Sequence, residues 1–291
     1  MRIGFVGFGE AAYHIAKGLR QPGIASITAF DIKVTDQVRQ RARETETRLA
    51  ESNAELAGSC DIMMSAVTAD RASQAAEQNA PHLSARHIYA DLNSVSPGVK
   101  QAISRIIEAS GARFAEIAMM APVPPYNHKV PMLAGGRGAQ EFVEMLSPFG
   151  ISAEIVSREV GTAAATKMFR SIIVKGMEAL LTECVLGATR YHADERVFAS
   201  LAESFPNMDW KKLADYMVGR VVVHGERRAR EMEEVAATLR EIDVEPIMAE
   251  AIVRRMDWSV EAGLKQMFQG EAPKSYREVV EAATKKPVGA D

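Results

Sequence analysis

The stretch Arg2-Ile-Gly-Phe-Val-Gly-Phe-Gly-Glu-Ala-Ala-Tyr-His-Ile-Ala-Lys-Gly-Leu19 decides the fold of this chain. The apolar run at residues 3–6 predicts a buried strand, and Gly7, Gly9 and Ala12 follow at G-x-G-x-x-A spacing, where a helix should open. Gly7 permits a tight turn, Gly9 lets backbone N–H groups approach a pyrophosphate, and Ala12 keeps the helix close to the strand. We therefore predict a dinucleotide-binding turn.

A second apolar run, residues 24–30, ends at Asp31, about 20 residues beyond the glycines, where such folds use an acid to accept the adenosine ribose hydroxyls. Asp31 repels a 2′-phosphate, so NAD is the expected cofactor. Lys33 can moderate that repulsion, and NADP is the alternative. The alternative for the whole unit is a strand-helix-strand whose glycines serve packing only. The predicted cofactor residues are Gly7, Phe8, Gly9, Glu10, Ala11, Ala12, Asp31, Lys33, Val67, Thr68 and Asn93.

The composition is that of a globular protein, with 47% hydrophobic and 25% charged residues among 291. A net charge of −3 and a pI of about 6.1 predict no binding to nucleic acid or to an anionic membrane. Cys60 and Cys184 lie far apart, so neither a disulfide nor a metal site is expected. No apolar run reaches 18 residues and the N-terminus enters a strand directly, so we expect a cytoplasmic protein.

Strand and helix patterns alternate up to residue 160, which predicts an α/β domain at 1–160 with a doubly wound parallel sheet of the Rossmann type. Within it, we expect one surface helix over 33–55, a strand at 62–67 and a proline-rich loop at 122–129. Val67 and Thr68 follow that strand at the carboxyl edge of the sheet, where ligands of such folds bind. A helix start without ligand contact is the alternative for both residues.

Beyond residue 160 the pattern is helical, which predicts an all-helical substrate and dimerisation domain at 161–291. A helix over 163–190 is long enough to be its spine, and shorter helices are expected at 210–223 and 225–242. Such a bundle should have little core of its own. We therefore predict a homodimer, in which a second subunit covers the apolar faces.

Two polar clusters carry the predicted chemistry. The loop 91–97 contains Asn93 and Ser94 after a strand, which predicts a loop that presents an amide and a hydroxyl to substrate; helix capping is the alternative. In the spine helix, Lys167, Arg170 and Ser171 share one face through i, i+3, i+4 spacing. A lysine beside a fixed cation can have a depressed pKa and act as a general base or acid, although a solvated lysine is the alternative.

The order of these motifs resembles the β-hydroxyacid dehydrogenase superfamily, which includes 3-hydroxyisobutyrate and 6-phosphogluconate dehydrogenases. Those enzymes combine an N-terminal G-x-G-x-x-G/A domain, a D-x-S-T-x-x-P loop and a G-x-x-x-x-x-K-x-x-N-N helix that enters a helical dimerisation domain. The matching positions are Gly7, Gly9, Ala12 and Asp31, then the loop 91–97, then the segment 161–171. The resemblance implies that Lys167 is the proton-transferring residue.

This chain departs from the superfamily pattern around the substrate. Arg170 and Ser171 replace the asparagine pair, and Met120-Ala-Pro122 replaces a glycine-rich substrate loop, where proline cannot donate an N–H. We expect Arg170 to bind an anionic group and Met120 to line an apolar pocket. The substrate is therefore expected to differ from 3-hydroxyisobutyrate, and the chain resembles a poorly described bacterial branch marked by residues 167–171 and 224–232.

His224 begins the second of these segments, and we expect it at a helix start, as a further substrate-binding residue. Arg227, Arg228 and Arg230 follow it. A solvent-facing helix with charge pairs four residues apart, such as Glu226 with Arg230, is the alternative for the arginines.

The prediction is an NAD(P)-dependent dehydrogenase that interconverts a hydroxy acid, with the hydroxyl β to the carboxylate and a bulky or apolar substituent, and its carbonyl form. Lys167 moves the proton, while Asn93, Ser94, Met120, Arg170, Ser171 and His224 contact the substrate. Three alternatives remain: an imine or double-bond reductase, a non-catalytic NAD-binding protein, and, less favoured by the helical half, a methyltransferase.

Overall fold

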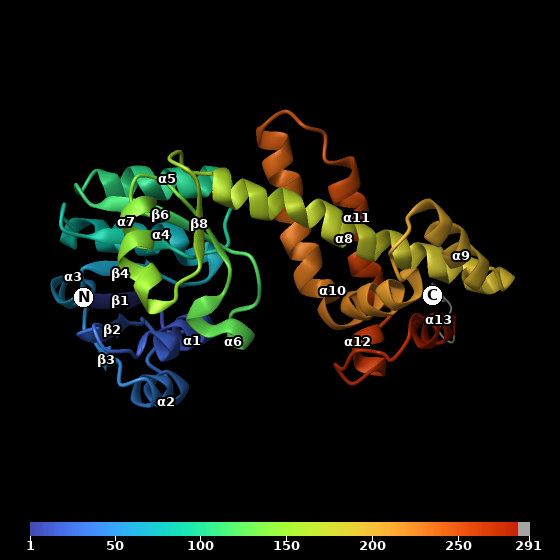
Figure 1. Cartoon of the computed structure of the whole chain (residues 1–291), viewed down its shortest axis with the longest axis horizontal. Coiled ribbons are helices and arrows are strands. Elements are labelled where there is room, and N and C mark those ends of the chain that lie inside the picture. The colour runs from blue at the N-terminus through green and yellow to red at the C-terminus, as the bar shows by residue number, and fades with distance from the viewer. Residues whose placement is uncertain (285–291) are drawn as a thin grey trace. The chain divides into compact units, whose positions relative to one another are not determined.

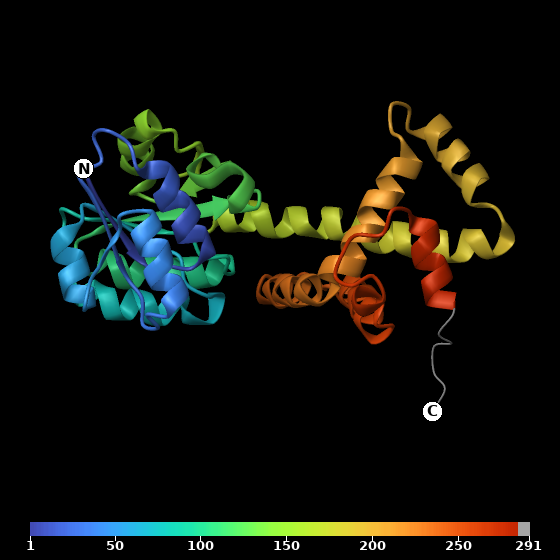
Figure 2. The ribbon, with the colours of Figure 1, turned by 90° about the horizontal axis from the view of Figure 1, so that it is seen from below.

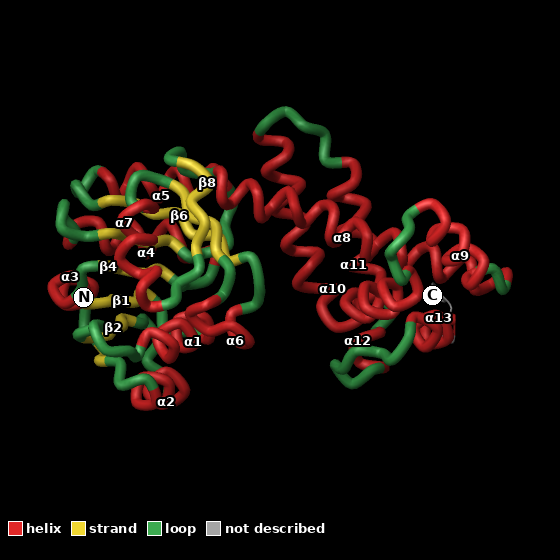
Figure 3. The backbone as a smooth tube through the Cα atoms, viewed as in Figure 1, coloured by secondary structure: helices red, strands yellow, loops and turns green. Residues whose placement is uncertain are grey.

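The computed structural model describes residues 1–284 and consists of two compact units, Met1–Lys167 and Met168–Asp291 (Figure 1). The last residues of the predicted second domain, 285–291, lie outside the described residues. Every strand belongs to the first unit, and the described part of the second contains only helices and the loops between them (Figure 3). The unit boundary at Lys167 falls inside a long helix, seven residues after the boundary expected from the sequence.

An eight-stranded sheet forms the first unit, with the strand order β3-β2-β1-β4-β5-β6-β7-β8. Neighbouring strands are parallel except β6 and β7, which are antiparallel. The chain winds outward from β1 in one direction and from β4 in the other, so the predicted doubly wound fold is confirmed. The strands are β1 (Arg2–Val6), β2 (Ser26–Phe30), β3 (Arg48–Leu49), β4 (Ile62–Ser65), β5 (Ile88–Asp91), β6 (Arg113–Met119), β7 (Met132–Gly135) and β8 (Ala153–Ser157).

Helices cover both faces of this sheet (Figure 2). Apolar side chains of α1 (Glu10–Leu19), α2 (Asp36–Glu44), α6 (Val123–Tyr126) and α7 (Ala139–Leu146) belong to the cluster on one face. Those of α3 (Asn53–Ser59), α4 (Ala72–Asn79) and α5 (Pro97–Glu108) belong to the cluster on the other. The inner strands β1, β4, β5 and β6 are buried on both faces, which explains their apolar runs, whereas the edge strands β3 and β8 are partly exposed.

Two segments differ from the sequence prediction. The single helix expected over 33–55 is wrong: α2 and α3 are separate, with β3 between them, because Thr35 and Ser52 each cap a new helix start by accepting a hydrogen bond from the backbone N–H three residues on. The loop expected at 122–129 contains α6, because prolines are tolerated in the first turn of a helix. The strand expected at 62–67 ends at Ser65.

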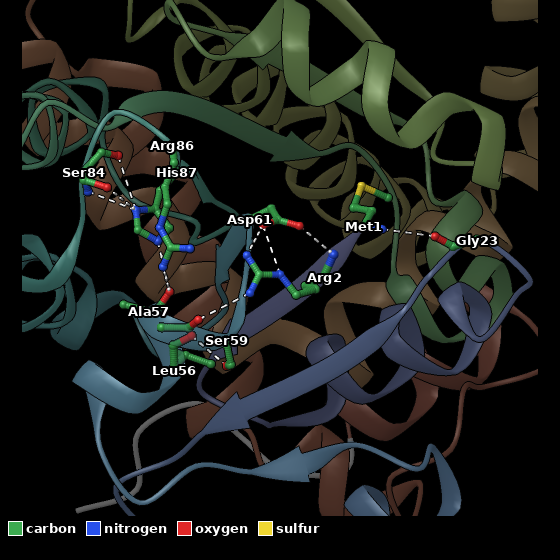
Figure 4. Close-up of polar contacts among 11 residues, drawn as sticks. Met1, Arg2, Gly23, Leu56, Ala57, Ser59, Asp61, Ser84, Arg86 and His87 are labelled. Carbon is green, nitrogen blue, oxygen red and sulfur yellow. Dashed lines mark hydrogen bonds and ion pairs between the residues drawn. The ribbon is translucent and has the colours of Figure 1, made fainter.

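Polar contacts fix the amino-terminal edge of the sheet (Figure 4). The backbone N–H of Arg2 donates to Asp61 Oδ2 at 3.0 Å, and its guanidinium bonds Asp61 Oδ1. This guanidinium holds the pKa of the Asp61 carboxyl below its usual range. His87 Nε2 lies 3.0 Å from the carbonyl of Ala57. Because these groups are used to join β1, α3, β4 and β5, this edge is structural.

The helical unit has two hydrophobic clusters of its own. It comprises the part of α8 (Thr162–Ala188) beyond Lys167, then α9 (Asp194–Ser204), α10 (Trp210–Glu241), α11 (Ile247–Glu261), α12 (Leu264–Met267) and α13 (Tyr276–Thr284). One cluster joins α8, α10 and α11, and the other joins α8 and α10 to α9, α12 and α13. The expectation that this bundle has little core is therefore wrong, because α10 offers apolar faces to helices on two sides.

A single helix, α10, replaces the two helices expected at 210–223 and 225–242. Gly225 is a packing residue in its interior: an added Cβ would lie 2.2 Å from the hydroxyl oxygen of Ser259 on α11. The glycine that suggested a break therefore permits close helix contact, and His224 lies in mid-helix and not at a helix start. No helix within residues 1–284 has the length and apolar character needed to cross a membrane.

Candidate functional site

Gly7 and Gly9 meet different requirements in the turn between β1 and α1. Gly7 has φ +79, and an added Cβ would lie 2.7 Å from the carbonyl oxygen of Ala66, so the fold itself demands glycine there. Gly9 has an ordinary φ of −73, and an added Cβ would meet nothing within 4 Å. Because the fold leaves open space at Gly9, this glycine suits close approach of a group from outside the protein.

The amino terminus of α1 opens onto that space. Gly9 occupies the N-cap position and provides no side chain to cap the helix. The first-turn N–H groups and the positive end of the helix dipole favour an anion at this position. Phe8 and Ala12 are buried beneath the turn, while Glu10 is exposed and Ala11 half-buried. The predicted residues therefore form a turn that fits the pyrophosphate of a dinucleotide.

Asp31 lies directly after β2 and is bonded to the glycine turn. Its Oδ2 accepts a hydrogen bond from the Phe8 N–H at 2.8 Å, and its Oδ1 accepts one from the Lys33 N–H at 2.8 Å. The Lys33 side chain is exposed. The carboxylate is thus held beside the turn by backbone donors.

Asn93 joins two loops at the carboxyl edge of the sheet. Its Oδ1 accepts from the Val67 N–H at 2.8 Å, and its Nδ2 donates to Ser65 Oγ and to Asp91 Oδ1. Asn93 is only 4% exposed, so its amide is engaged inside the protein. Val67 in turn touches the glycine turn, since a Cβ added to Gly7 would lie 2.8 Å from its Cγ1. Thr68, the next residue, is exposed.

A buried lysine completes this network, and it was missed in the sequence. Lys100 on α5 is 1% exposed; its Nζ donates to the Asp91 carbonyl at 2.7 Å and lies 3.3 Å from Asp91 Oδ2. Buried charges are tolerated where they are paired and hydrogen-bonded. A signal was present, because Lys100 has the i, i+3, i+7 spacing of the core residues Ile103 and Ile107.

Lys167 and Ser94 meet at this same edge. Lys167 lies in the second turn of α8 and its Nζ donates to Ser94 Oγ at 2.7 Å. Ser94 is exposed and follows directly on the buried Asn93, while Lys167 is half-buried. An amine and a hydroxyl in hydrogen-bond contact, accessible to solvent, can pass a proton to or from a bound alcohol or carbonyl.

The other predicted substrate residues are spread over both units. In the first unit, Met120 is half-buried and its N–H donates to the Pro131 carbonyl at 2.8 Å. In the helical unit, Arg170 is exposed and Ser171 is half-buried, both on α8. Ser171 follows Lys167 by one helical turn of sequence.

His224, in the middle of α10, is half-buried and borders a cavity of about 210 Å³ in the helical unit. Arg227, Lys265 and Gln266 also line the cavity. Burial lowers the pKa of the His224 imidazole, and the neighbouring cations lower it further. Both effects favour the neutral form of the imidazole.

A doubly wound sheet with a dinucleotide turn, followed by a helical unit, defines an NAD(P)-dependent oxidoreductase. Residues 2–124 match the family model described as the NAD binding domain of 6-phosphogluconate dehydrogenase. Residues 188–259 match a domain of unknown function, DUF1932. The chain belongs to the β-hydroxyacid dehydrogenase superfamily, as the motif order predicted.

Solved structures agree with this membership. A conserved hypothetical protein from Sinorhizobium meliloti 1021 is 36% identical, with 98% of this chain and 96% of that chain covered and a TM-score of 0.86. A conserved protein of unknown function, described as structurally similar to 3-hydroxyacid dehydrogenases, is 33% identical, with 94% and 100% covered and a TM-score of 0.80. A 3-hydroxyisobutyrate dehydrogenase from Mycobacterium tuberculosis, solved with L-serine, shares the fold at 11% identity, with 96% and 98% covered and a TM-score of 0.73.

Proposed function

We propose that this protein is a dehydrogenase that interconverts a β-hydroxy acid bearing a bulky or apolar substituent and its carbonyl form, with Lys167 as the proton-transferring residue. The observation that carries the proposal is the 2.7 Å contact between Lys167 Nζ and Ser94 Oγ. It lies at the carboxyl edge of the sheet, the edge at which doubly wound folds bind their ligands.

Lys167 acts on the substrate oxygen. In the oxidation direction its neutral amine takes the hydroxyl proton, and in the reduction direction its ammonium returns a proton to the carbonyl oxygen. Ser94 holds the amine in place and can donate to the same oxygen. Residues 7–12 would hold the pyrophosphate of a nicotinamide cofactor, which when bound would supply the hydride-transfer chemistry. Asn93 acts by fixing the loops on which Val67 and Ser94 lie, since its amide is already bonded to protein groups.

NAD is the proposed cofactor. The Asp31 carboxylate, held by the N–H groups of Phe8 and Lys33, is suited to accept ribose hydroxyls and repels a 2′-phosphate. The exposed Lys33 ammonium lies two residues away and weakens this repulsion. We expect a preference for NAD that Asp31→Ala reduces, measured as the ratio of kcat/KM with the two cofactors. A native preference for NADP would contradict the assignment.

For the substrate, we assign the carboxylate to Arg170 and the apolar substituent to Met120. Arg170 is exposed and lies three residues after Lys167 on α8. Its guanidinium matches a carboxylate in a two-point contact. Ser171 and His224 are assigned as further polar contacts to the substrate.

The test is a screen for hydride transfer, in which the absorbance of the reduced nicotinamide is monitored. The panel contains 3-hydroxy acids of increasing bulk, 2-hydroxy acids and cyclic imines, each with NAD and NADP. Turnover of cyclic imines alone would identify an imine reductase. Intact NAD binding without turnover of any panel member would favour a non-catalytic NAD-binding protein.

Lys167→Ala is the decisive variant in that screen. Loss of general acid–base catalysis typically costs about 10²- to 10⁴-fold in rate, so we expect kcat to fall within this range while the Kd for NAD stays unchanged. Lys129→Ala removes an exposed lysine of the same unit and serves as the control. Unchanged kcat in Lys167→Ala would refute the role of this amine.

A homodimer is the proposed assembly. On α8, Ile173 and Leu180 are 67% and 61% exposed, and the half-buried Met177 and Cys184 alternate with them at spacings of four and three residues. This is the spacing of a helix–helix seam, and a second copy of the chain offers a matching stripe. Ile173→Glu with Leu180→Glu should yield a monomer by light scattering. A monomeric native protein would refute the dimer.

The proposed location is the cytoplasm, and the two free cysteines, Cys60 and Cys184, are consistent with it.

A further inference from the structure

Glu116 on β6 is a buried carboxylate that the sequence analysis did not select. It is fully buried, and both of its oxygens accept hydrogen bonds from the start of α8: Oε2 from the Gly161 N–H and Oε1 from the Ala164 N–H, each at 2.7 Å. From Phe114 to Met119 its strand is otherwise apolar, and a buried carboxylate in such a run requires partners. The partners are supplied by backbone 45 and 48 residues further along the chain.

These two bonds replace a helix cap. α8 begins at Thr162, so Gly161 takes the N-cap position and Ala164 the third helical position. In a common capping arrangement, side chains of the N-cap and third residues bond each other's backbone N–H groups. Gly161 and Ala164 lack such side chains, and Gly161 has φ +114, a conformation that favours glycine. One carboxylate from a neighbouring strand satisfies both donors and also lies at the positive end of the helix.

The sheet makes room for this side chain. Glu116 pairs in register with Gly135 on β7, where an added Cβ would lie 2.9 Å from Glu116 Oε2. On its other side Glu116 pairs with Asp91 on β5. Residues paired in register project from the same face of a sheet. Two buried carboxylates thus stand side by side, Asp91 bonded to the loop that carries Ser94 and Glu116 bonded to the helix that carries Lys167.

We propose that Glu116 is a positioning residue, which fixes the first turn of α8 so that the Lys167 amine stays in contact with Ser94. Lys167 follows Ala164 by three residues, about 4.5 Å along the helix axis. A shift of the first turn is therefore passed directly to the amine. This inference rests on the proposed role of Lys167.

Glu116→Gln tests the inference because it keeps the shape of the side chain and one acceptor oxygen, while its amide nitrogen faces a backbone N–H. A displacement near 1 Å can cost about 100-fold in rate, so we expect kcat to fall about 10- to 100-fold. The Kd for NAD, measured by fluorescence titration, should change less than about twofold. Gln101→Ala is the control, since Gln101 Nε2 donates to the Val160 carbonyl at the same helix start but bonds no α8 N–H.

A double-mutant cycle separates positioning from a general loss of structure. If Glu116 acts through Lys167, Glu116→Gln should lower kcat no further in the Lys167→Ala background. An equal fold-loss in both backgrounds, or a parallel loss of NAD affinity, would overturn the proposal. Unchanged kcat in Lys167→Ala alone would instead refute the proposed function.

Amide hydrogen exchange supplies a readout that needs no substrate. In the native protein the Gly161 and Ala164 amides should exchange slowly, although both lie where helical N–H groups have no helical acceptor. In Glu116→Gln at least one should exchange faster, with the β1 amides unchanged. Fast exchange at both sites in the native protein would overturn the proposal. This measurement on the native protein remains decisive even when the variant does not fold.

Discussion

The two units use buried charge in different ways. In the nucleotide-binding unit, Glu116 bonds the backbone N–H groups of a helix start, and Asp91 bonds the Asn93 backbone N–H together with the side chains of Asn93 and Lys100. In the helical unit, buried charges pair with other side chains: Glu178 Oε1 accepts from Arg220 at 3.1 Å and Oε2 from Arg228 at 2.5 Å. A carboxylate bonded to backbone N–H groups fixes the loop or helix start that carries the candidate site residues. A carboxylate bonded to arginines fixes how two helices, α8 and α10, pack.

The largest expected effect is on the helical unit. Glu178→Ala leaves the Arg228 guanidinium, 3% exposed, without its partner. Removing one member of a buried pair costs about 3–5 kcal/mol, so the free energy of unfolding of this unit should fall by that amount in denaturant titration. Glu233→Ala breaks an exposed pair with Arg230 and should cost at most about 1 kcal/mol. Equal costs for the two variants would contradict the stabilising role assigned to the buried pair in the helical unit.

A smaller effect separates the two glycines of the nucleotide-binding turn. Gly7→Ala forces φ +79 and a 2.7 Å contact, and should lower the free energy of unfolding by about 1–3 kcal/mol. Gly9→Ala meets no protein atom within 4 Å, so stability should change by less than about 0.5 kcal/mol. The Kd of the Gly9→Ala variant for NAD should nevertheless rise about tenfold, which corresponds to a loss of about 1.4 kcal/mol in binding free energy. The reason is that the added methyl group fills the space proposed for the cofactor. Undiminished NAD affinity in Gly9→Ala would remove the ligand argument for that residue.

The smallest effect concerns pH. Burial lowers the pKa of His224 below its usual value of about 6.5, so the unfolded chain binds the proton more readily than the folded one. The contribution of His224 to the stability of the helical unit is therefore fully present above about pH 6.5 and decreases as the pH falls below that value. His224→Gln should flatten this dependence in thermal unfolding between pH 7 and 5. His82→Gln, at an exposed position, is the control, and an equal flattening there would contradict the prediction.

Local sequence predicted those parts of the site whose chemistry and spacing lie close together in the chain. The glycine turn, Asp31 and the loop with Ser94 all follow apolar runs that end at one edge of a parallel sheet. Wrong predictions arose where distant residues decided: Gly225 signalled a helix break, but contact with Ser259 makes it part of a continuous helix. For Asn93, which the sequence predicts to contact substrate and cofactor, the structure adds internal partners, because its amide bonds Val67, Ser65 and Asp91. Its burial depends on neighbours that spacing does not reveal.

The sequence by itself determined the doubly wound sheet, the dinucleotide turn and the superfamily, because periodicity and glycine spacing act over a few residues. Only the tertiary structure decided which buried charges meet: Lys100 with Asp91, Glu116 with the start of α8, and Glu178 with two arginines of α10. These contacts join residues 9 to 50 positions apart. A charged residue inside an apolar sequence pattern indicates that the residue must have a partner in the folded protein. Strand order and helix packing determine which residue that partner is.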